Sequence, residues 1–182
     1  MSQKNFIRKK FFLKKKKNYF KIEEKFFYPL IRLLSKQKKK ISNISLYYPS
    51  FYEVNVLKIL DLKFFKKINF LLPKIKKNHS IDFFKWKKND TLNLSKYGIP
   101  EPINSINITP DAILVPLLSF DKKKNRIGYG KGFYDKFLMK FLKKNKKILT
   151  VGVAFSFQKH HNLPINDDDY RLDYIITEKG IF

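Results

Sequence analysis

Two neighbouring runs of sequence carry most of the information about the fold: ILVPL at residues 113–117 and RIGYGKGFYD at residues 126–135. The first run is continuously apolar and of strand length, which is typical of a strand buried on both faces of a parallel sheet. The second run has glycine at every second position from 128 to 132 and leads into a helical pattern at residues 133–142. A buried strand, a glycine-rich loop and a helix in this order predict an α/β domain.

Strand and helix patterns alternate on both sides of these runs. The basic segment of about residues 1–40 has apolar residues at helical spacing and predicts two helices, broken near Asn18. The other predicted elements are strands at residues 44–48, 68–72, 81–86, 149–155 and 173–177, and a helix capped by Asn55 that runs to about Lys66. We expect Pro49 and Pro73 to end the strands before them and Gly98–Pro102 to form a stiff loop. The alternation predicts a single α/β domain over residues 1–182, with a mainly parallel central sheet and the basic helical segment packed on it.

The composition excludes several classes of protein. The 182 residues are 43% hydrophobic and include 19 phenylalanines, enough to bury a core in one domain. There is no cysteine, which excludes a disulfide framework, a thiolate zinc site and a thiol nucleophile. No apolar stretch approaches the ~20 residues of a membrane-spanning helix, and lysines interrupt the apolar residues near the N-terminus. We therefore expect a cytoplasmic protein with no membrane partner.

The net charge of +25 raises the alternative of a nucleic-acid-binding protein. The excess is mostly lysine and is spread along the chain, including residues 122–124 and 143–147. Proteins that read nucleic acids concentrate their charge on one element and use arginine for bidentate contacts. The pattern therefore favours a lysine-rich surface with no specific nucleic-acid partner, while a basic, ribosome-associated nucleic-acid-binding protein stays open as the alternative.

The glycine-rich segment is built like an anion cradle. Glycines at alternate positions directly before a helix let backbone amides approach a phosphate at the helix N-terminus. Arg126 and Lys131 add cationic donors, and Asp135 places a carboxylate in the first helical turn. Phosphate, cation and carboxylate together indicate a Mg-nucleotide, although the spacing matches neither the dinucleotide-binding fingerprint nor the Walker A motif. A flexible glycine loop, and an acid at Asp135 that only favours the helix dipole, are the alternatives.

The same segment resembles the signature of the 5-formyltetrahydrofolate cyclo-ligase family, and other parts of the chain agree with the family in order. Ile113–Pro116 and Phe120-Asp121 resemble a strand and a Phe-Asp pair of the family, with Arg126 five residues after Asp121. Gly98–Pro102 resembles its Gly-Ile-Pro-Glu-Pro loop. Its closing segment is matched by Phe157-Gln158, Leu163-Pro164, Asp169, Asp173 and Ile176-Thr177-Glu178. The resemblance covers nearly the whole chain and implies a three-layer α/β/α fold.

The resemblance implies a ligase of folate one-carbon metabolism whose partners are 5-formyltetrahydrofolate and ATP. The expected reaction closes 5-formyltetrahydrofolate to 5,10-methenyltetrahydrofolate and releases ADP and phosphate. ATP phosphorylates the formyl oxygen, N10 attacks the activated carbon, and phosphate departs. Mg²⁺ is the implied cofactor, ATP is a co-substrate, and we expect the enzyme to be a monomer. A kinase or a nucleotide-binding module with another acceptor would explain the cradle but not the match along the chain.

The resemblance also implies a set of site residues. Those that bind ATP are Lys4, Arg8, Arg126, Ile127, Gly128, Tyr129, Gly130, Lys131, Gly132, Phe133 and Tyr134. Arg126 and Lys131 are the implied catalytic cations, which neutralise the transferred phosphoryl charge. Those that contact the folate are Tyr48, Glu53, Tyr129, Gly130, Lys131, Gly132 and Phe133. Asp135 and Asp169 are the implied magnesium ligands.

Several of these residues have ordinary structural explanations when each is taken alone. Lys4 and Arg8, one helical turn apart, would form a solvated basic face. Asp169 would be an acid in a polar loop, Glu53 a surface residue and Tyr48 an aromatic at a strand end. The chain also departs from the family at Lys124, where the family has glycine. We expect Asn125 to share the strain of that turn, because asparagine tolerates left-handed conformations.

Overall fold

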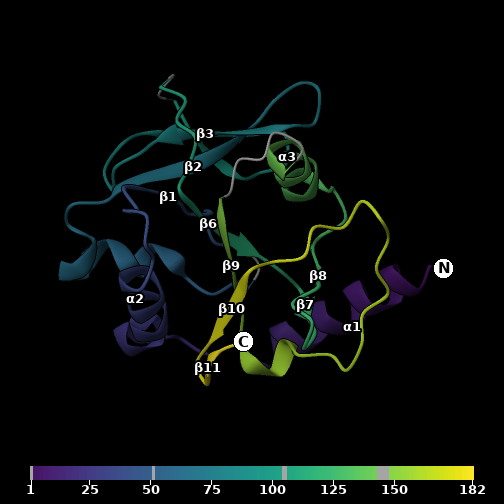
Figure 1. The fold of residues 1–182 in the computed structure, drawn as a ribbon. Coiled ribbons are helices and arrows are strands. Elements are labelled where there is room, and N and C mark those ends of the chain that lie inside the picture. The colour runs from purple at the N-terminus through teal and green to yellow at the C-terminus, as the bar shows by residue number, and fades with distance from the viewer. Residues whose placement is uncertain (1, 51, 104–105, 143–147) are drawn as a thin grey trace.

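The computed structural model describes residues 2–50, 52–103, 106–142 and 148–182, and within these ranges a seven-stranded sheet forms the centre of the molecule (Figure 1). Its strands follow the order β11-β10-β9-β6-β1-β2-β3. They are β1 (Asn43–Ser45), β2 (Asn69–Ile75), β3 (Ile81–Lys85), β6 (Ala112–Pro116), β9 (Leu149–Val153), β10 (Tyr174–Thr177) and β11 (Gly180–Ile181). The inner strands pair in parallel, whereas the outermost strands β3 and β11 pair antiparallel to their neighbours. The predicted α/β class with a mainly parallel sheet is confirmed.

Helices lie on both faces of this sheet (Figure 1). They are α1 (Gln3–Asn18), α2 (Tyr28–Ser35) and α3 (Phe133–Leu142), with 3₁₀ helices η1 (Glu24–Phe27), η2 (Val56–Asp61), η3 (Lys63–Phe65) and η4 (Ser156–Gln158). Leu30 of α2 shares a buried cluster with Leu114 of β6, and Phe137 of α3 shares a second cluster with Val115. Because successive strand residues point to opposite faces, this division places α2 and α3 on opposite sides of β6.

Helix α1 packs beside the sheet through a short apolar stripe. Ile7 and Phe11, four residues apart on one helix face, are buried against Leu118, Ile127 and Leu163. Leu118 directly precedes, and Ile127 ends, a hairpin formed by β7 (Ser119–Phe120) and β8 (Arg126–Ile127). The stripe therefore fixes α1 next to the glycine-rich segment that follows β8. In the described parts of the chain, no helix combines the length and apolar character that crossing a membrane requires.

Some predicted element boundaries are wrong for local reasons. Pro73 does not end its strand. Strand β1 pairs with residues 69–71 of β2, and beyond them β3 is the only strand of the described residues that pairs with β2, so a residue without an amide hydrogen is tolerated. Asn55 does cap a helix, through a 3.1 Å hydrogen bond from the Leu57 amide, but the extended backbone of Leu62 divides that helix into η2 and η3. The expected loop at Gly98–Pro102 contains strand β5 (Pro100–Pro102), paired with β4 (Leu92–Leu94).

The turn between β7 and β8 holds Lys124 itself in the left-handed region, with φ of +66°. The expectation that Asn125 would take this conformation is wrong. Asn125 instead donates to the buried Asp121 carboxylate from its backbone and side-chain nitrogens, both at 3.0 Å. The strain of the turn therefore falls on a residue with a Cβ atom.

We expect Lys124→Gly to be about 1 kcal/mol more stable than Lys124→Ala, because an L-residue in the left-handed region costs roughly 1–2 kcal/mol and glycine offsets part of the gain by its larger unfolded-state entropy. Both variants lose the approach of Lys124 Nζ to the Tyr174 ring, at 5.5 Å from its centre, so the pair isolates the backbone effect. Urea unfolding of the two variants measures it. Equal stabilities would show that this turn carries no backbone strain.

Candidate functional site

A cleft of about 520 Å³ opens at the carboxyl ends of the central parallel strands. From β1 the chain continues to β2 toward one edge of the sheet, and from β6 it continues to β9 and β10 toward the other edge. The direction in which strands are added therefore reverses between β1 and β6. In open α/β sheets, ligands bind in the crevice at such a point. Tyr47 and Tyr48, which come after β1, and Pro116, which ends β6, all line the cleft. The fold thus places a ligand-sized cavity where sheets of this kind bind their ligands.

The cleft brings together every site residue predicted from the sequence. They are Lys4, Arg8, Tyr48, Glu53, Arg126, Ile127, Gly128, Tyr129, Gly130, Lys131, Gly132, Phe133, Tyr134, Asp135 and Asp169. They come from α1, from the loop after β1, from the segment that joins β8 to α3, and from the loop before β10. Lys4 and Arg8 therefore face a cavity and Glu53 is buried, so the purely surface explanations of these three residues are wrong.

Arginine side chains lie against the backbone of the loop before α3 at two of its glycines. A Cβ atom at Gly128 would come within 2.8 Å of Arg126 Nη1, and one at Gly130 within 3.3 Å of Arg8 Cζ. Gly130 also has φ of +97°, which residues with a Cβ atom rarely adopt. The loop therefore lets two guanidinium groups approach the main chain close to the N-terminus of α3, as an anion-binding site needs.

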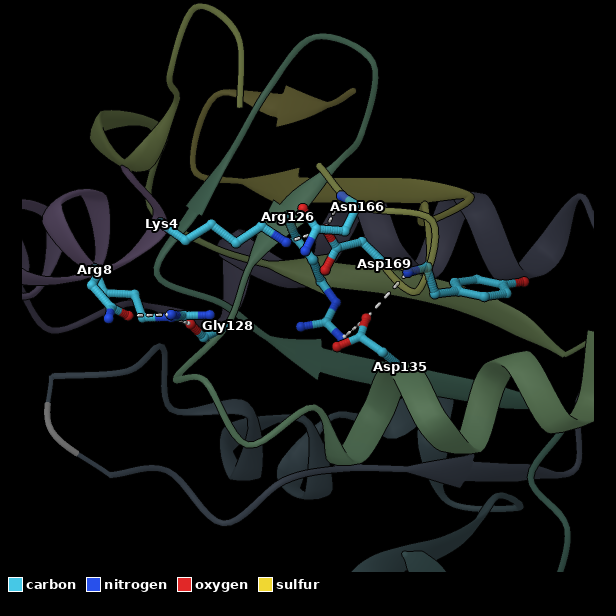
Figure 2. Close-up of polar contacts among 9 residues, drawn as sticks. Lys4, Arg8, Arg126, Gly128, Asp135, Asn166 and Asp169 are labelled. Carbon is cyan, nitrogen blue, oxygen red and sulfur yellow. Dashed lines mark hydrogen bonds and ion pairs between the residues drawn. The ribbon is translucent and has the colours of Figure 1, made fainter. Parts of the chain in front are cut away.

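Two cation–carboxylate pairs lie along the cleft (Figure 2). Arg126 Nη2 donates to Asp135 Oδ1 at 2.7 Å, and Lys4 Nζ pairs with Asp169. The Tyr170 amide donates to Asp135 Oδ1 at 3.2 Å, and the Asn166 amide donates to Asp169 Oδ2 at 2.7 Å. Because Tyr170 directly follows Asp169 in the chain, these bonds hold the two carboxylates close to each other.

Arginine donors are available to a ligand in this region. The Arg126 side chain is only 5% exposed, and its Nε has no hydrogen-bond partner among the described residues. Arg8 donates from Nε to the Gly128 carbonyl at 3.1 Å and from Nη1 to Asn5 Oδ1 at 2.6 Å. A buried donor without a partner costs free energy, so the arrangement suits a ligand that supplies several acceptor oxygens. A phosphate group has this chemistry.

The carboxylates of Asp135 and Asp169 fit a magnesium ion that is bound together with a phosphate. Magnesium is usually held by one or two carboxylates, with substrate phosphates and water completing the shell. The two side chains keep 20% and 27% of their surface exposed, and both line the cleft. Among the described residues there is no group of three or more acidic, histidine or cysteine side chains that would form a closed metal site. Two partly exposed carboxylates beside a phosphate site would suit an ion that is bound together with a nucleotide.

A buried carboxylate lies on the cleft wall among aromatic side chains. Glu53 is 7% exposed, and its Oε2 accepts a 2.8 Å hydrogen bond from the Ser50 amide. Burial raises the pKa of Glu53, and this rise is opposed by the nearby Lys15 ammonium and by hydrogen bonds from Ser50 and Tyr129. Burial likewise raises the phenol pKa of Tyr47, Tyr129 and Tyr134. The carboxylate is thus surrounded by neutral phenols and one ammonium group.

Lys15, in the last turn of α1, is fully buried and donates from Nζ to the Tyr129 hydroxyl at 2.8 Å. Burial lowers the pKa of Lys15 from 10.5 to about 8, and Glu53 opposes this change in part. The folded chain therefore releases this proton near pH 8, whereas the unfolded chain keeps it until about pH 10.5. Between these values the unfolded state binds more protons, so stability rises with pH.

We expect the stability of the wild type relative to Lys15→Met to increase by roughly 3 kcal/mol between pH 8 and pH 10.5, since one pKa unit corresponds to about 1.4 kcal/mol. The comparison removes the general effect of discharging the other lysines. Urea unfolding of both proteins across this pH range measures the difference. A difference that does not change with pH would contradict the assignment of a neutral, buried Lys15 above pH 8.

Sequence reasoning missed part of the cleft wall. Tyr97 and Glu101 both line the cleft. The Tyr97 ring lies 5.5 Å from the Phe133 ring, and Lys131 Nζ lies 5.7 Å from the centre of the Tyr97 ring. The Gly98–Pro102 motif was a signal for this wall, because Glu101 lies within it and Tyr97 directly precedes it. Lys15 gave no signal of its own, since it is one of four consecutive lysines at residues 14–17.

Comparison with known protein families and sequences identifies relatives of the chain. The model of the 5-formyltetrahydrofolate cyclo-ligase family matches residues 1–178. A 5-formyltetrahydrofolate cyclo-ligase of Haemophilus influenzae is 31% identical over 148 residues, which cover 78% of this chain and 78% of that protein. Another, of Mycoplasma genitalium, is 34% identical over 137 residues, which cover 75% of this chain and 72% of that protein.

Solved structures give a similar result. The NMR structure of Aquifex aeolicus 5,10-methenyltetrahydrofolate synthetase superimposes with a TM-score of 0.75 at 31% identity, covering 99% of this chain and 92% of that one. A 5,10-methenyltetrahydrofolate synthetase from Mycoplasma pneumoniae gives a TM-score of 0.72 at 29% identity, covering 97% of this chain and 99% of that one. The similarity therefore extends over the whole fold, including the segments that line the cleft.

Proposed function

The chain belongs to the 5-formyltetrahydrofolate cyclo-ligase family and closes 5-formyltetrahydrofolate to 5,10-methenyltetrahydrofolate with ATP, and we propose that the cleft between β1 and β6 is where it does so. The observation that carries this proposal is that cations, carboxylates and the glycine-rich loop converge on one cavity from distant parts of the chain. ATP needs a site for its phosphates, and 5-formyltetrahydrofolate needs a pocket for a flat heterocycle. The lining of the cleft supplies residues suited to both.

We propose that ATP binds along the glycine-rich loop from Arg126 to Tyr134. The unused donor of Arg126, the guanidinium of Arg8 and the ammonium groups of Lys4 and Lys131 would neutralise its phosphates. The N-terminus of α3 and the glycine amides favour an anion at the same place. Binding would exchange the Arg126–Asp135 and Lys4–Asp169 pairs for contacts between these cations and phosphate oxygens.

Asp135 and Asp169 would then be free to hold Mg²⁺ through their carboxylate oxygens. When bound, the ion supplies charge neutralisation on the phosphates during phosphoryl transfer. Each carboxylate is paired with a cation in the free protein and would be paired with the metal ion when the nucleotide is bound. Neither carboxylate would then be left without an opposite charge when its cation turns to the phosphates.

We propose that the reaction runs in two displacements. The formyl oxygen at N5 attacks the γ-phosphorus of ATP, and the bond to ADP breaks. N10 then attacks the formyl carbon, its proton is released, and the C–O bond to phosphate breaks to give the methenyl product. Arg126 and Lys131 would stabilise the charge on the transferred phosphoryl group, and the protein otherwise contributes positioning.

The pterin ring is proposed to lie against Tyr48, the loop at residues 129–133 and Glu53. A carboxylate is suited to the donor-rich edge of a pterin, and Glu53 is held in place by the Ser50 amide. The aromatic side chains of Tyr129 and Phe133 offer flat surfaces to a heterocycle. In this proposal the folate lies at Glu53 and the phosphates lie at Arg126, in different parts of the same cleft.

We expect purified protein to convert 5-formyltetrahydrofolate to 5,10-methenyltetrahydrofolate only when ATP and Mg²⁺ are both present, with one ADP formed per product. The absorbance of the methenyl product measures turnover, and a coupled assay measures ADP. Omitting ATP, or adding a metal chelator, is the control. A folded protein that gives no methenyl absorbance with all components present would refute the proposed activity of the cleft.

We further propose that the enzyme acts in the cytoplasm as a monomer and has no specific nucleic-acid partner. Its positive charge is mostly lysine and is dispersed along the chain, which gives non-specific attraction to polyanions rather than a recognition surface. The arginines that could form bidentate contacts include Arg8 and Arg126, and both face the cleft. This arrangement favours the enzyme over the nucleic-acid-binding alternative.

A further inference from the structure

Lys15 is a buried cation that the proposed reaction does not use. It is 1% exposed, and its Nζ lies 2.8 Å from the Tyr129 hydroxyl and 5.4 Å from the centre of the Tyr129 ring. Tyr129 lines the cleft and Lys15 does not, so the lysine lies behind the tyrosine. Burying an ammonium group costs free energy unless an opposite charge and hydrogen bonds compensate for the lost hydration. A lysine at this position therefore requires a partner.

The charged group that faces Lys15 is Glu53. The ammonium and the carboxylate attract each other, and Tyr129 is near both: its hydroxyl accepts from Lys15 Nζ, and its presence lowers the pKa of the Glu53 carboxyl. Glu53 is also fixed on its own loop by the Ser50 amide and hydroxyl, at 2.8 Å and 3.3 Å from Oε2. The three side chains form a polar cluster that reaches from the C-terminal end of α1 to the wall of the cleft.

We propose that Lys15 is a positioning residue for the folate, which acts through Tyr129 to keep the Glu53 carboxylate ionised and directed at the donor-bearing edge of the pterin ring. This inference rests on the proposed function, in which Glu53 meets the pterin. Lys15 itself touches neither substrate, since it does not line the cleft. Its effect therefore falls on folate binding and not on the binding of ATP.

The groups around Glu53 make this role dependent on pH. Those that face it are Lys15 from α1, Tyr129 from the glycine-rich loop, Tyr134 from α3 and Tyr47 from the segment after β1. Burial raises the pKa of all three phenols, so among these groups Lys15 is the one that changes charge near neutral pH. Removing its charge raises the pKa of Glu53 further, because the opposing attraction is lost. A chain without Lys15 should then bind folate least at low pH and recover as Glu53 ionises.

The test is the dissociation constant of 5-formyltetrahydrofolate, measured by calorimetry without ATP from pH 6 to pH 9. The proteins are wild type, Lys15→Met, Glu53→Gln and the double variant. At pH 7 we expect Lys15→Met to bind folate about 10–100-fold more weakly, as expected for weakening a charge-assisted contact. ATP affinity should stay within about twofold, and the difference from wild type should shrink above pH 8. In the Glu53→Gln background, Lys15→Met should cause no further loss.

Lys16→Met is the matched control, because Lys16 is the exposed neighbour of Lys15 and lies outside the cleft. If Lys15→Met does not fold, Tyr129→Phe breaks the connection while keeping both charges, and the same loss of folate affinity is expected. Equal folate affinities of wild type and Lys15→Met at every pH would overturn the inference. So would a parallel loss of folate and ATP affinity without recovery at high pH, which is what a packing defect gives. A wild-type protein that binds ATP but no folate would instead refute the proposed function, and this inference with it.

Discussion

Arg126→Met is expected to lower kcat by about 10³–10⁵, the range measured where an arginine stabilises a transferred phosphoryl group. The Arg126 guanidinium is held in place before any ligand binds: it is 5% exposed, it donates to Asp135 at 2.7 Å, and a side chain at Gly128 would collide with it. Methionine retains most of the side-chain volume and removes the charge. Initial rates at saturating ATP and folate measure the effect.

Two further variants separate charge from geometry at this position. Arg126→Lys keeps the positive charge but loses the planar fork, so we expect an intermediate loss of about 10² in kcat. Arg171→Met is the matched control, because Arg171 is exposed and does not line the cleft. If Arg126→Met reduced kcat less than tenfold while remaining folded, Arg126 would have no part in phosphoryl transfer.

Asp135→Asn is expected to lower kcat by roughly 10²–10³, comparable to the loss of one preorganised electrostatic contact. Asparagine keeps the shape of the side chain but removes the charge that a magnesium ion needs. Raising the Mg²⁺ concentration should restore part of the activity, because a weakened site still fills by mass action. The measurement is kcat as a function of Mg²⁺, with the exposed Asp167→Asn as the control. An unchanged kcat at limiting Mg²⁺ would remove Asp135 from the mechanism.

The same substitution should also be visible in the stability of the free protein. Asp135 is more than a first-turn acid on a helix, because it accepts hydrogen bonds from the buried Arg126 and from the Tyr170 amide. Asparagine can still accept from both donors, but it leaves the guanidinium charge without an opposite charge. We expect Asp135→Asn to lower the free energy of unfolding by about 1–3 kcal/mol without nucleotide. A melting curve with and without ATP checks this, since phosphate oxygens should replace part of the lost contact.

The features that could be predicted from the sequence are those with a local pattern. The apolar run at residues 113–117 and the glycine-rich loop predicted the buried strand and the helix at Phe133–Leu142, and the loop between these elements lines the cleft. Pro73 was misleading because its effect depends on whether a neighbouring strand extends alongside it, and β1 stops too early to require the missing amide. Local sequence does not contain that information.

All the predicted site residues line the cleft. They could be predicted because they lie in segments with recognisable sequence motifs. Lys15 could not be found in this way, since it resembles the lysines on either side of it and differs only in facing inward. The Gly98–Pro102 motif predicts a stiff loop, but it does not indicate which neighbouring side chain faces the cleft, so it does not predict Tyr97 as part of the wall. Whether a side chain is buried, and against which partner, is a property of packing between distant segments.

The pair between Lys4 and Asp169 joins residues that are 165 positions apart in the chain. At a ribosomal rate of about 5–20 residues per second, Lys4 emerges many seconds before its partner exists. Helix α1 has no packing partner for Ile7 and Phe11 early in synthesis, because the hairpin and Leu163, which cover these two residues, are also synthesised late. Contacts of such long separation slow folding, and the wall of the cleft cannot be complete before Asp169 has been synthesised. A protease that removed α1 from the finished protein would take Lys4, Arg8 and Lys15 together, so one cut would remove two residues of the cleft wall and the buried cation behind it.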